Sequence, residues 1–79
     1  MDCGIFVQSI MLMATSLGLA TCPQAALAEY PDIVREQLGY SKDNLLLCGI
    51  ALGYEDVSAA INNYRTTREN LDYFTKFFD

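Results

Sequence analysis

The segment from Cys3 to Ala28 contains no charged residue, and this feature most constrains what the chain can fold into. Thirteen of the twenty residues at 3–22 are apolar, two are glycine and five are polar. The polar residues are ordered, because Gln8 and Thr15 lie seven positions apart and so do Ser9 and Ser16. This spacing places a narrow polar stripe on an otherwise apolar helix.

A helix that is apolar almost all round is normally buried in a folded protein. We therefore predict a buried helix over residues 3–17. Asp2 is expected to cap the start of this helix, and Gly18 to close its end in the left-handed conformation.

Two other interpretations of the same segment remain open. Ala26-Leu27-Ala28 resembles a signal-peptidase site, so residues 1–28 could be the signal peptide of a small exported protein. Export signals begin with positive charge, however, and this segment carries Asp2 and no Lys or Arg. A membrane span is opposed by the polar residues and glycines that interrupt a stretch of barely sufficient length.

The uncharged segment ends in a turn at residues 17–26. After Gly18 we predict a short extended stretch at 19–22, and then a helical run over residues 24–30 into which Pro23 bends the chain. The turn offers backbone amides and almost no reactive side chains. We therefore assign no catalytic residue here and expect the chemistry to come from a bound cofactor.

The middle of the chain predicts a short helix followed by a strand. Pro31 suits the first position of a helix and Gly39 its end. After a polar turn at 40–44, the apolar run at 45–54 is typical of a strand buried on both faces. Such a strand needs two neighbours, and the chain offers mainly residues 19–22. The predicted sheet is therefore incomplete, with its remainder missing or on a partner.

The composition of the chain excludes several classes of partner and of chemistry. Of 79 residues, 52% are hydrophobic, which is more than a small monomer easily buries, so packing against another chain is expected. The net charge of −5 argues against nucleic-acid and anionic-membrane partners. Without histidine, the chain lacks Ser-His-Asp and Cys-His chemistry. Three cysteines without a CxxC motif favour reduced thiols in the cytoplasm and no metal site.

Residues 57–64 predict a short helix, and two of the three arginines, Arg65 and Arg68, follow it with two threonines between them. These groups could hold a phosphate through charge-assisted hydrogen bonds. Alternatively, they belong to a solvated loop in which Arg68 pairs with Glu69 or Asp72. The tail at 69–79 is acidic and aromatic, fits helix and strand equally, and is expected to dock on a neighbouring surface.

Three segments, 2–24, 29–56 and 62–74, follow one another without insertions and together resemble the FMN-dependent nitroreductase family, in particular its nitrobenzoate-reductase-like members. The most specific parts are GLATCPQ at 18–24 and LLLCGIALGYED at 45–56. The resemblance implies an α+β flavoprotein, dimeric in the family, with the helix at 3–17 in the dimer core. Residues 1–79 would be the C-terminal half of a single domain.

The resemblance also implies site residues and chemistry. Backbone groups of Pro23, Gln24, Ala25 and Ala26 would approach the reactive edge of FMN, and Arg65 and Arg68 would grip its phosphate. NAD(P)H would reduce the flavin, which would then pass electrons to a nitroaromatic or quinone by ping-pong hydride transfer. The expected partners are a second copy or a complementing N-terminal half. The alternative is a non-enzymatic module that self-associates through residues 3–17.

Overall fold

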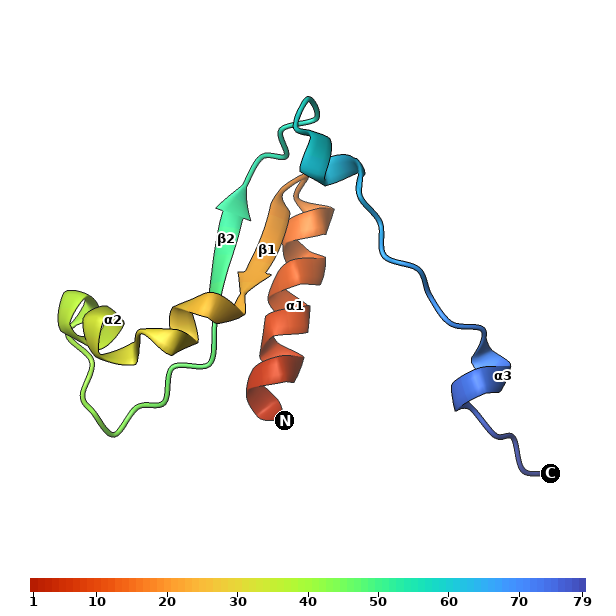
Figure 1. The fold of residues 1–79 in the computed structure, drawn as a ribbon, viewed down its shortest axis with the longest axis horizontal. Helices are drawn as coiled ribbons and strands as arrows, with labels where there is room; N and C mark the ends of the chain where they lie inside the picture. The colour runs from red at the N-terminus through yellow and green to blue at the C-terminus, as the bar shows by residue number, and fades with distance from the viewer.

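The computed structural model describes all of residues 1–79 (Figure 1). A long helix comes first, followed by two antiparallel strands whose connection holds two short helices, and then by a C-terminal arm. The elements are α1 (Asp2–Ser16), β1 (Ala20–Gln24), η1 (Ala25–Glu29), α2 (Pro31–Leu38), β2 (Gly49–Gly53), η2 (Ala60–Asn63) and α3 (Leu71–Phe74). The predicted α+β class with a partial sheet is therefore confirmed.

The long helix α1 lies one residue earlier at each end than predicted. The prediction that Asp2 caps it is wrong, because Met1 is the N-cap and no side chain bonds to the free amides. Asp2 instead lies in the first turn, where its carboxylate interacts favourably with the helix dipole.

The prediction for the other end of α1 is confirmed. Gly18 adopts a left-handed φ of 76°. Its amide donates to the Thr15 carbonyl at 3.1 Å, and the Leu19 amide donates to the Ala14 carbonyl at 2.9 Å. These two bonds form a Schellman motif, which satisfies carbonyls at the helix end and turns the chain into β1.

The hydroxyl groups of the polar stripe of α1 are satisfied within the helix. Three hydroxyls of the helix, two of them in adjacent positions at its C-terminal end, each donate to a backbone carbonyl three or four residues earlier. The pairs are Ser9 with Ile5, Thr15 with Met11 and Ser16 with Met13, at 3.0, 3.0 and 2.6 Å. A helix whose hydroxyls already have acceptors can be covered by an apolar surface without leaving those donors unpaired.

The sheet has only two strands, and each is an edge strand. Ala20 pairs with Gly53 and Gln24 with Gly49. Pro23 lies inside β1, opposite Ile50, so the prediction that it already bends the chain into a helix is wrong. An edge strand accommodates a residue without an N–H. The second strand is also shorter than the predicted 45–54, because β1 gives it pairing partners only at 49–53.

The connection between the strands follows the prediction at most points. The run at 24–30 forms the tighter 3₁₀ helix η1 over Ala25–Glu29. Pro31 is the first residue of α2. Gly39 ends α2 with a left-handed φ of 74°. Because Pro31 lacks an amide hydrogen, it suits the first turn, where that donor would have no partner in the helix.

The chain buries almost nothing by itself. Ala14, at 6% exposure, is its one buried residue. Phe6 and Met13 of α1 are 67% and 62% exposed, so α1 is not buried within this chain. The predicted two-sided burial of the strand is likewise absent, since Leu52 is 61% exposed. The radius of gyration is 16.9 Å, whereas a compact domain of this length has about 12 Å.

The C-terminal arm accounts for much of this extension (Figure 1). The helix predicted at 57–64 is only the 3₁₀ turn η2 over Ala60–Asn63. Beyond it the chain is extended apart from α3, a single helical turn at Leu71–Phe74. The question of helix or strand at 69–79 thus resolves into one turn between extended residues. No helix of the chain has the length and apolar character that crossing a membrane requires.

Candidate functional site

The predicted ring-binding residues lie where β1 passes into η1. Pro23 and Gln24 end the strand, and Ala25 and Ala26 begin the 3₁₀ helix. Gln24 is extended, with φ −126° and ψ 98°. All four residues are exposed. Since the amides at the start of a helix precede its first internal hydrogen bond, this turn has backbone donors and small side chains on an open surface.

The first residue of β2 holds the turn in place. Gln24 pairs with Gly49, the first residue of that strand. A Cβ atom on Gly49 would lie 2.2 Å from Cδ1 of Leu27, so the side chain of Leu27 occupies the space that glycine leaves free. The start of β2 therefore supports both the strand residues and the helical residues of the turn.

The two predicted phosphate-binding arginines lie in the extended segment after η2. Nη1 of Arg65 donates to the carbonyls of Asn62 and Tyr64, at 2.7 and 3.0 Å. Nη1 of Arg68 donates to the Thr66 hydroxyl and to the Thr67 carbonyl. Nε and Nη2 of both guanidinium groups have no protein acceptor. Both side chains are exposed, and the proposed pairing of Arg68 with Glu69 or Asp72 is not formed.

The chain does not bring these two groups of residues together. The segment that carries Arg65 and Arg68 leads away from the sheet on one side of α1, whereas η1 lies on the other side (Figure 1). A single ligand that contacted both groups would need a different path of the arm or residues of a second chain.

The loop between β2 and η2 is stabilised by Asp56. Its carboxylate accepts hydrogen bonds from the hydroxyl and the amide of Ser58, at 2.6 and 3.0 Å. These two bonds lower the pKa of Asp56 from its ordinary value. The Asp56 carbonyl also accepts from the Asn62 side chain at 2.7 Å, which ties the loop to η2 and so to the start of the arm.

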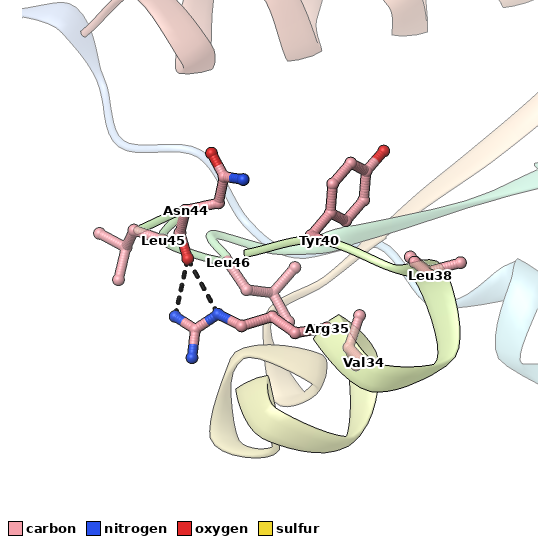
Figure 2. A pocket seen from close by; sticks show the side chains of 7 residues that line it. All are labelled: Val34, Arg35, Leu38, Tyr40, Asn44, Leu45 and Leu46. Carbon is pink, nitrogen blue, oxygen red and sulfur yellow. Dashed lines mark hydrogen bonds between the residues drawn. The ribbon is translucent and has the colours of Figure 1, made fainter. Parts of the chain in front are cut away.

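Sequence reasoning missed the third arginine. Arg35 of α2 donates from Nε and Nη2 to the carbonyl oxygen of Asn44, at 3.0 and 2.7 Å (Figure 2). Its Nη1 lies 3.3 Å from the Asp32 carboxylate, the one ion pair of the chain. The side chain of Arg35 is only 17% exposed. Its signal in the sequence is a lone arginine on a short amphipathic helix that precedes a ten-residue loop, residues 39–48.

Arg35 forms one wall of a cavity of about 270 Å³ between α2 and the loop that follows it. Figure 2 shows its seven lining residues, Val34, Arg35, Leu38, Tyr40, Asn44, Leu45 and Leu46. A larger, almost wholly apolar hollow of about 350 Å³ lies along α1, between Phe6 and Leu17 and against Leu52 of β2. Three cysteines are free, and no three potential metal ligands cluster.

Comparison with known proteins identifies the fold. The model of the nitroreductase family matches residues 1–54. A 4-nitrobenzoate reductase of Pseudomonas putida is 39% identical over 77 residues, which are 98% of this chain and 34% of that protein. Nitroreductase NfnB of Mycolicibacterium smegmatis is 46% identical over 96% of this chain and 32% of its own length.

The solved structures agree. A crystal structure described as the FMN-dependent nitroreductase NfnB from Mycobacterium smegmatis, in complex with NADPH, superposes with a TM-score of 0.93 at 45% identity. It matches 99% of this chain and 35% of its own. The chain thus spans about a third of the length of the relatives it matches.

These matches bear on the alternatives from the sequence. Residues 1–28, which the export hypothesis would remove, form α1 and β1 and lie inside the family match. The export hypothesis and the non-enzymatic module are therefore not supported. Because the family model covers more than half of the chain and the relatives align along nearly all of it, the chain belongs to the nitroreductase family.

Proposed function

We propose that the chain is part of an FMN-dependent nitroreductase that uses NAD(P)H to reduce nitroaromatics or quinones. The observation that carries this proposal is the superposition on the FMN-dependent relative, at a TM-score of 0.93 and 45% identity. The relatives named as 4-nitrobenzoate reductases support the substrate class. Residues 1–79 then form one part of a single nitroreductase domain.

Each of the two groups of residues suits one end of FMN, and assembly with a second chain would bring the two groups to one ligand. Arg65 and Arg68 each keep Nε and Nη2 without a protein acceptor, and neither has a carboxylate partner. Guanidinium groups with unpaired donors can bind a phosphate, whose oxygens accept charge-assisted hydrogen bonds. At the other end, the exposed turn with Ala25 and Ala26 leaves its backbone open to a flat ring.

Each group has a distinct role in this proposal. The amides of Ala25 and Ala26 hold and orient the reactive edge of the ring, and Pro23 and Gln24 fix the path of the chain that presents them. Arg65 and Arg68 hold the phosphate. When bound, FMN supplies the redox centre between NAD(P)H and the acceptor. This division agrees with a turn that carries no nucleophile and no general base.

Assembly completes the site in this proposal. One chain buries only Ala14 and leaves the apolar hollow along α1 open. We propose that α1 packs in the core of a homodimer, or against a polypeptide that supplies the rest of the family domain. Burial of apolar surface favours such an assembly, with a gross gain of about 25 cal/mol per Å² that is partly offset by the entropy lost on association. Three free cysteines agree with a cytoplasmic location.

The test is activity of the assembled protein. The chain is produced together with the remaining part of the M. smegmatis relative, and NADPH oxidation is followed with 4-nitrobenzoate as acceptor. We expect oxidation that depends on both polypeptides, on FMN and on the acceptor. A stable complex of the two polypeptides that retains FMN but reduces no nitroaromatic or quinone would contradict the proposed reaction.

A further inference from the structure

We propose that Arg35 is a positioning residue, which fixes the turn at residues 23–26 through the loop at 39–48. This role in flavin binding rests on the proposed function, whereas the contact itself does not. Arg35 touches none of the predicted site residues. Its effect is therefore transmitted through the chain that it holds.

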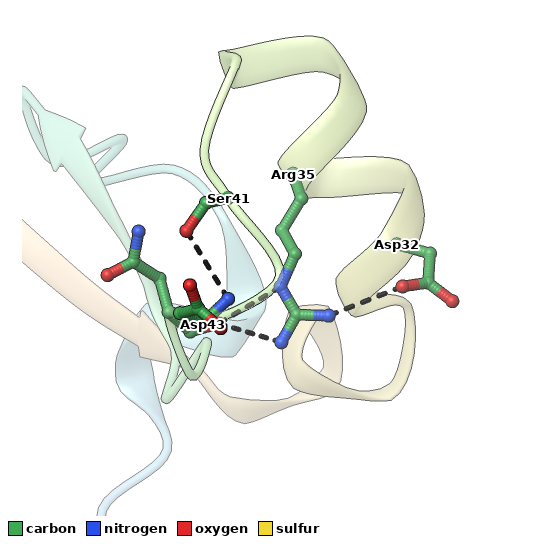
Figure 3. A network of polar contacts seen from close by, with 5 residues as sticks. Asp32, Arg35, Ser41 and Asp43 are labelled. Carbon is green, nitrogen blue, oxygen red and sulfur yellow. Dashed lines mark hydrogen bonds and ion pairs between the residues drawn. The ribbon is translucent and has the colours of Figure 1, made fainter.

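Arg35 holds both ends of one turn. Its own carbonyl accepts a hydrogen bond from the Tyr40 amide at 3.0 Å. Its guanidinium binds the Asn44 carbonyl through two nitrogens. Figure 3 shows the guanidinium contacts, including the one with Asp32, and the Ser41 hydroxyl, which accepts from the Asp43 amide at 3.3 Å. The segment at 40–44 is therefore bracketed by a single residue of α2.

A short segment joins this turn to β2. Only residues 45–48 separate Asn44 from Gly49, and Gly49 pairs with Gln24. Leu27 of η1 fills the space above Gly49. The chain from Gln24 through η1, α2 and the loop at 39–48 therefore closes on itself where Gly49 pairs with Gln24. Within this closed segment, the contact of the Arg35 side chain with the Asn44 carbonyl is a tie between α2 and the loop.

The contact is a charge-assisted one. Hydrogen bonds from a charged donor are stronger than neutral ones, and the Arg35 side chain that makes them is only 17% exposed. The two-stranded sheet buries little and has no third strand to hold Gly49 in register. Without the tie, the loop gains freedom and the start of β2 frays away from Gln24, so the amides of Ala25 and Ala26 lose their support.

The experiment compares Arg35→Met with two controls in the assembled protein. Asn44→Ala removes the side chain but keeps the carbonyl that Arg35 binds. Lys42→Met removes a positive charge from the same loop without touching the contact. Two quantities are measured: alkylation of the half-buried Cys48, relative to that of free cysteine, and affinity for FMN and for riboflavin, which lacks the phosphate.

We expect Arg35→Met to accelerate Cys48 alkylation about tenfold. It should lower the affinity for FMN and the affinity for riboflavin equally, because the residues that contact the ring edge are disturbed and the phosphate site is not. Arg35→Lys, which keeps the charge and a single donor nitrogen, should show smaller changes in both quantities than Arg35→Met. Hydrogen exchange in α1 should stay unchanged, whereas global destabilisation would accelerate it. Both controls should behave as wild type.

An unchanged rate of Cys48 alkylation in Arg35→Met would show that the contact does not hold the loop, whether or not flavin binds. Faster alkylation with unchanged affinity for both flavins would overturn the positioning role. If wild type binds neither flavin, the proposed function fails, and Cys48 alkylation still decides whether Arg35 holds the loop.

Discussion

Leu27 of η1 lies directly over Gly49 of β2, so close that a Cβ atom on Gly49 would come within 2.2 Å of Leu27 Cδ1. This relationship joins the proposed flavin-contacting turn to the strand that supports it. It also explains why the strand begins with glycine, since any side chain there would displace Leu27.

Gly49→Ala should therefore destabilise the assembled protein by about 1 kcal/mol, because Leu27 must leave its place. Leu27 is 40% exposed and can rotate outward, which limits the cost. Gly53→Ala is the matched control, since a Cβ atom there meets nothing within 4 Å. Urea unfolding measures both variants.

The coupling between the two residues is tested in the double variant. In a Leu27→Ala background, Gly49→Ala should cost nothing, since the displaced side chain is gone. An equal cost of Gly49→Ala in both backgrounds would show that the contact is not its cause.

Met13→Asp should weaken assembly. Met13 lines the apolar hollow along α1, and a carboxylate buried there has no partner. We expect association to weaken by about 2 kcal/mol or more, as measured by sedimentation equilibrium. Val57→Asp, at a residue that is 82% exposed and outside this hollow, is the control. If both variants associate as tightly as wild type, α1 is not the interface.

Ser58→Ala should raise the pKa of Asp56 partway to its ordinary value, because the hydroxyl bond is lost and the amide bond remains. The folded pKa of Asp56 is depressed. Its contact with Ser58 thus stabilises the loop above the ordinary pKa of a carboxyl group and is lost as pH falls through the lower, folded value.

An NMR titration of the Asp56 carboxyl carbon measures this pKa. Ser41→Ala serves as control, since Ser41 bonds to the Asp43 amide and not to Asp56. An Asp56 pKa that does not change in Ser58→Ala would mean that the hydroxyl contributes nothing to the shift.

Local signals in the sequence predicted local structure well. Gly18 and Gly39 end their helices because their left-handed φ values suit glycine, and Pro31 starts α2 because it has no amide to satisfy. The cap at Asp2 failed because helix formation began one residue earlier than expected. Pro23 was misjudged because the restriction it imposes depends on its strand being central or at an edge, which is a tertiary property.

Burial could not be predicted for this chain by itself. The pattern of α1 predicts a buried helix, yet Phe6 and Met13 remain exposed in this chain. The contact between Arg35 and Asn44 also escaped prediction. It joins a side chain to a backbone carbonyl nine residues away, and no residue pattern encodes that choice of acceptor.

The proposed function requires the turn at 23–26 and the pair Arg65 and Arg68 to bind the two ends of FMN. Its most direct test is a titration of FMN and of riboflavin into the assembled protein, wild type and Arg65→Gln/Arg68→Gln. Each lost phosphate contact should weaken FMN by roughly tenfold to a hundredfold, since charged hydrogen bonds contribute about 1.5–3 kcal/mol. Riboflavin affinity should stay unchanged. Equal FMN affinity in both proteins, or no flavin bound by the assembled wild type, would contradict the account.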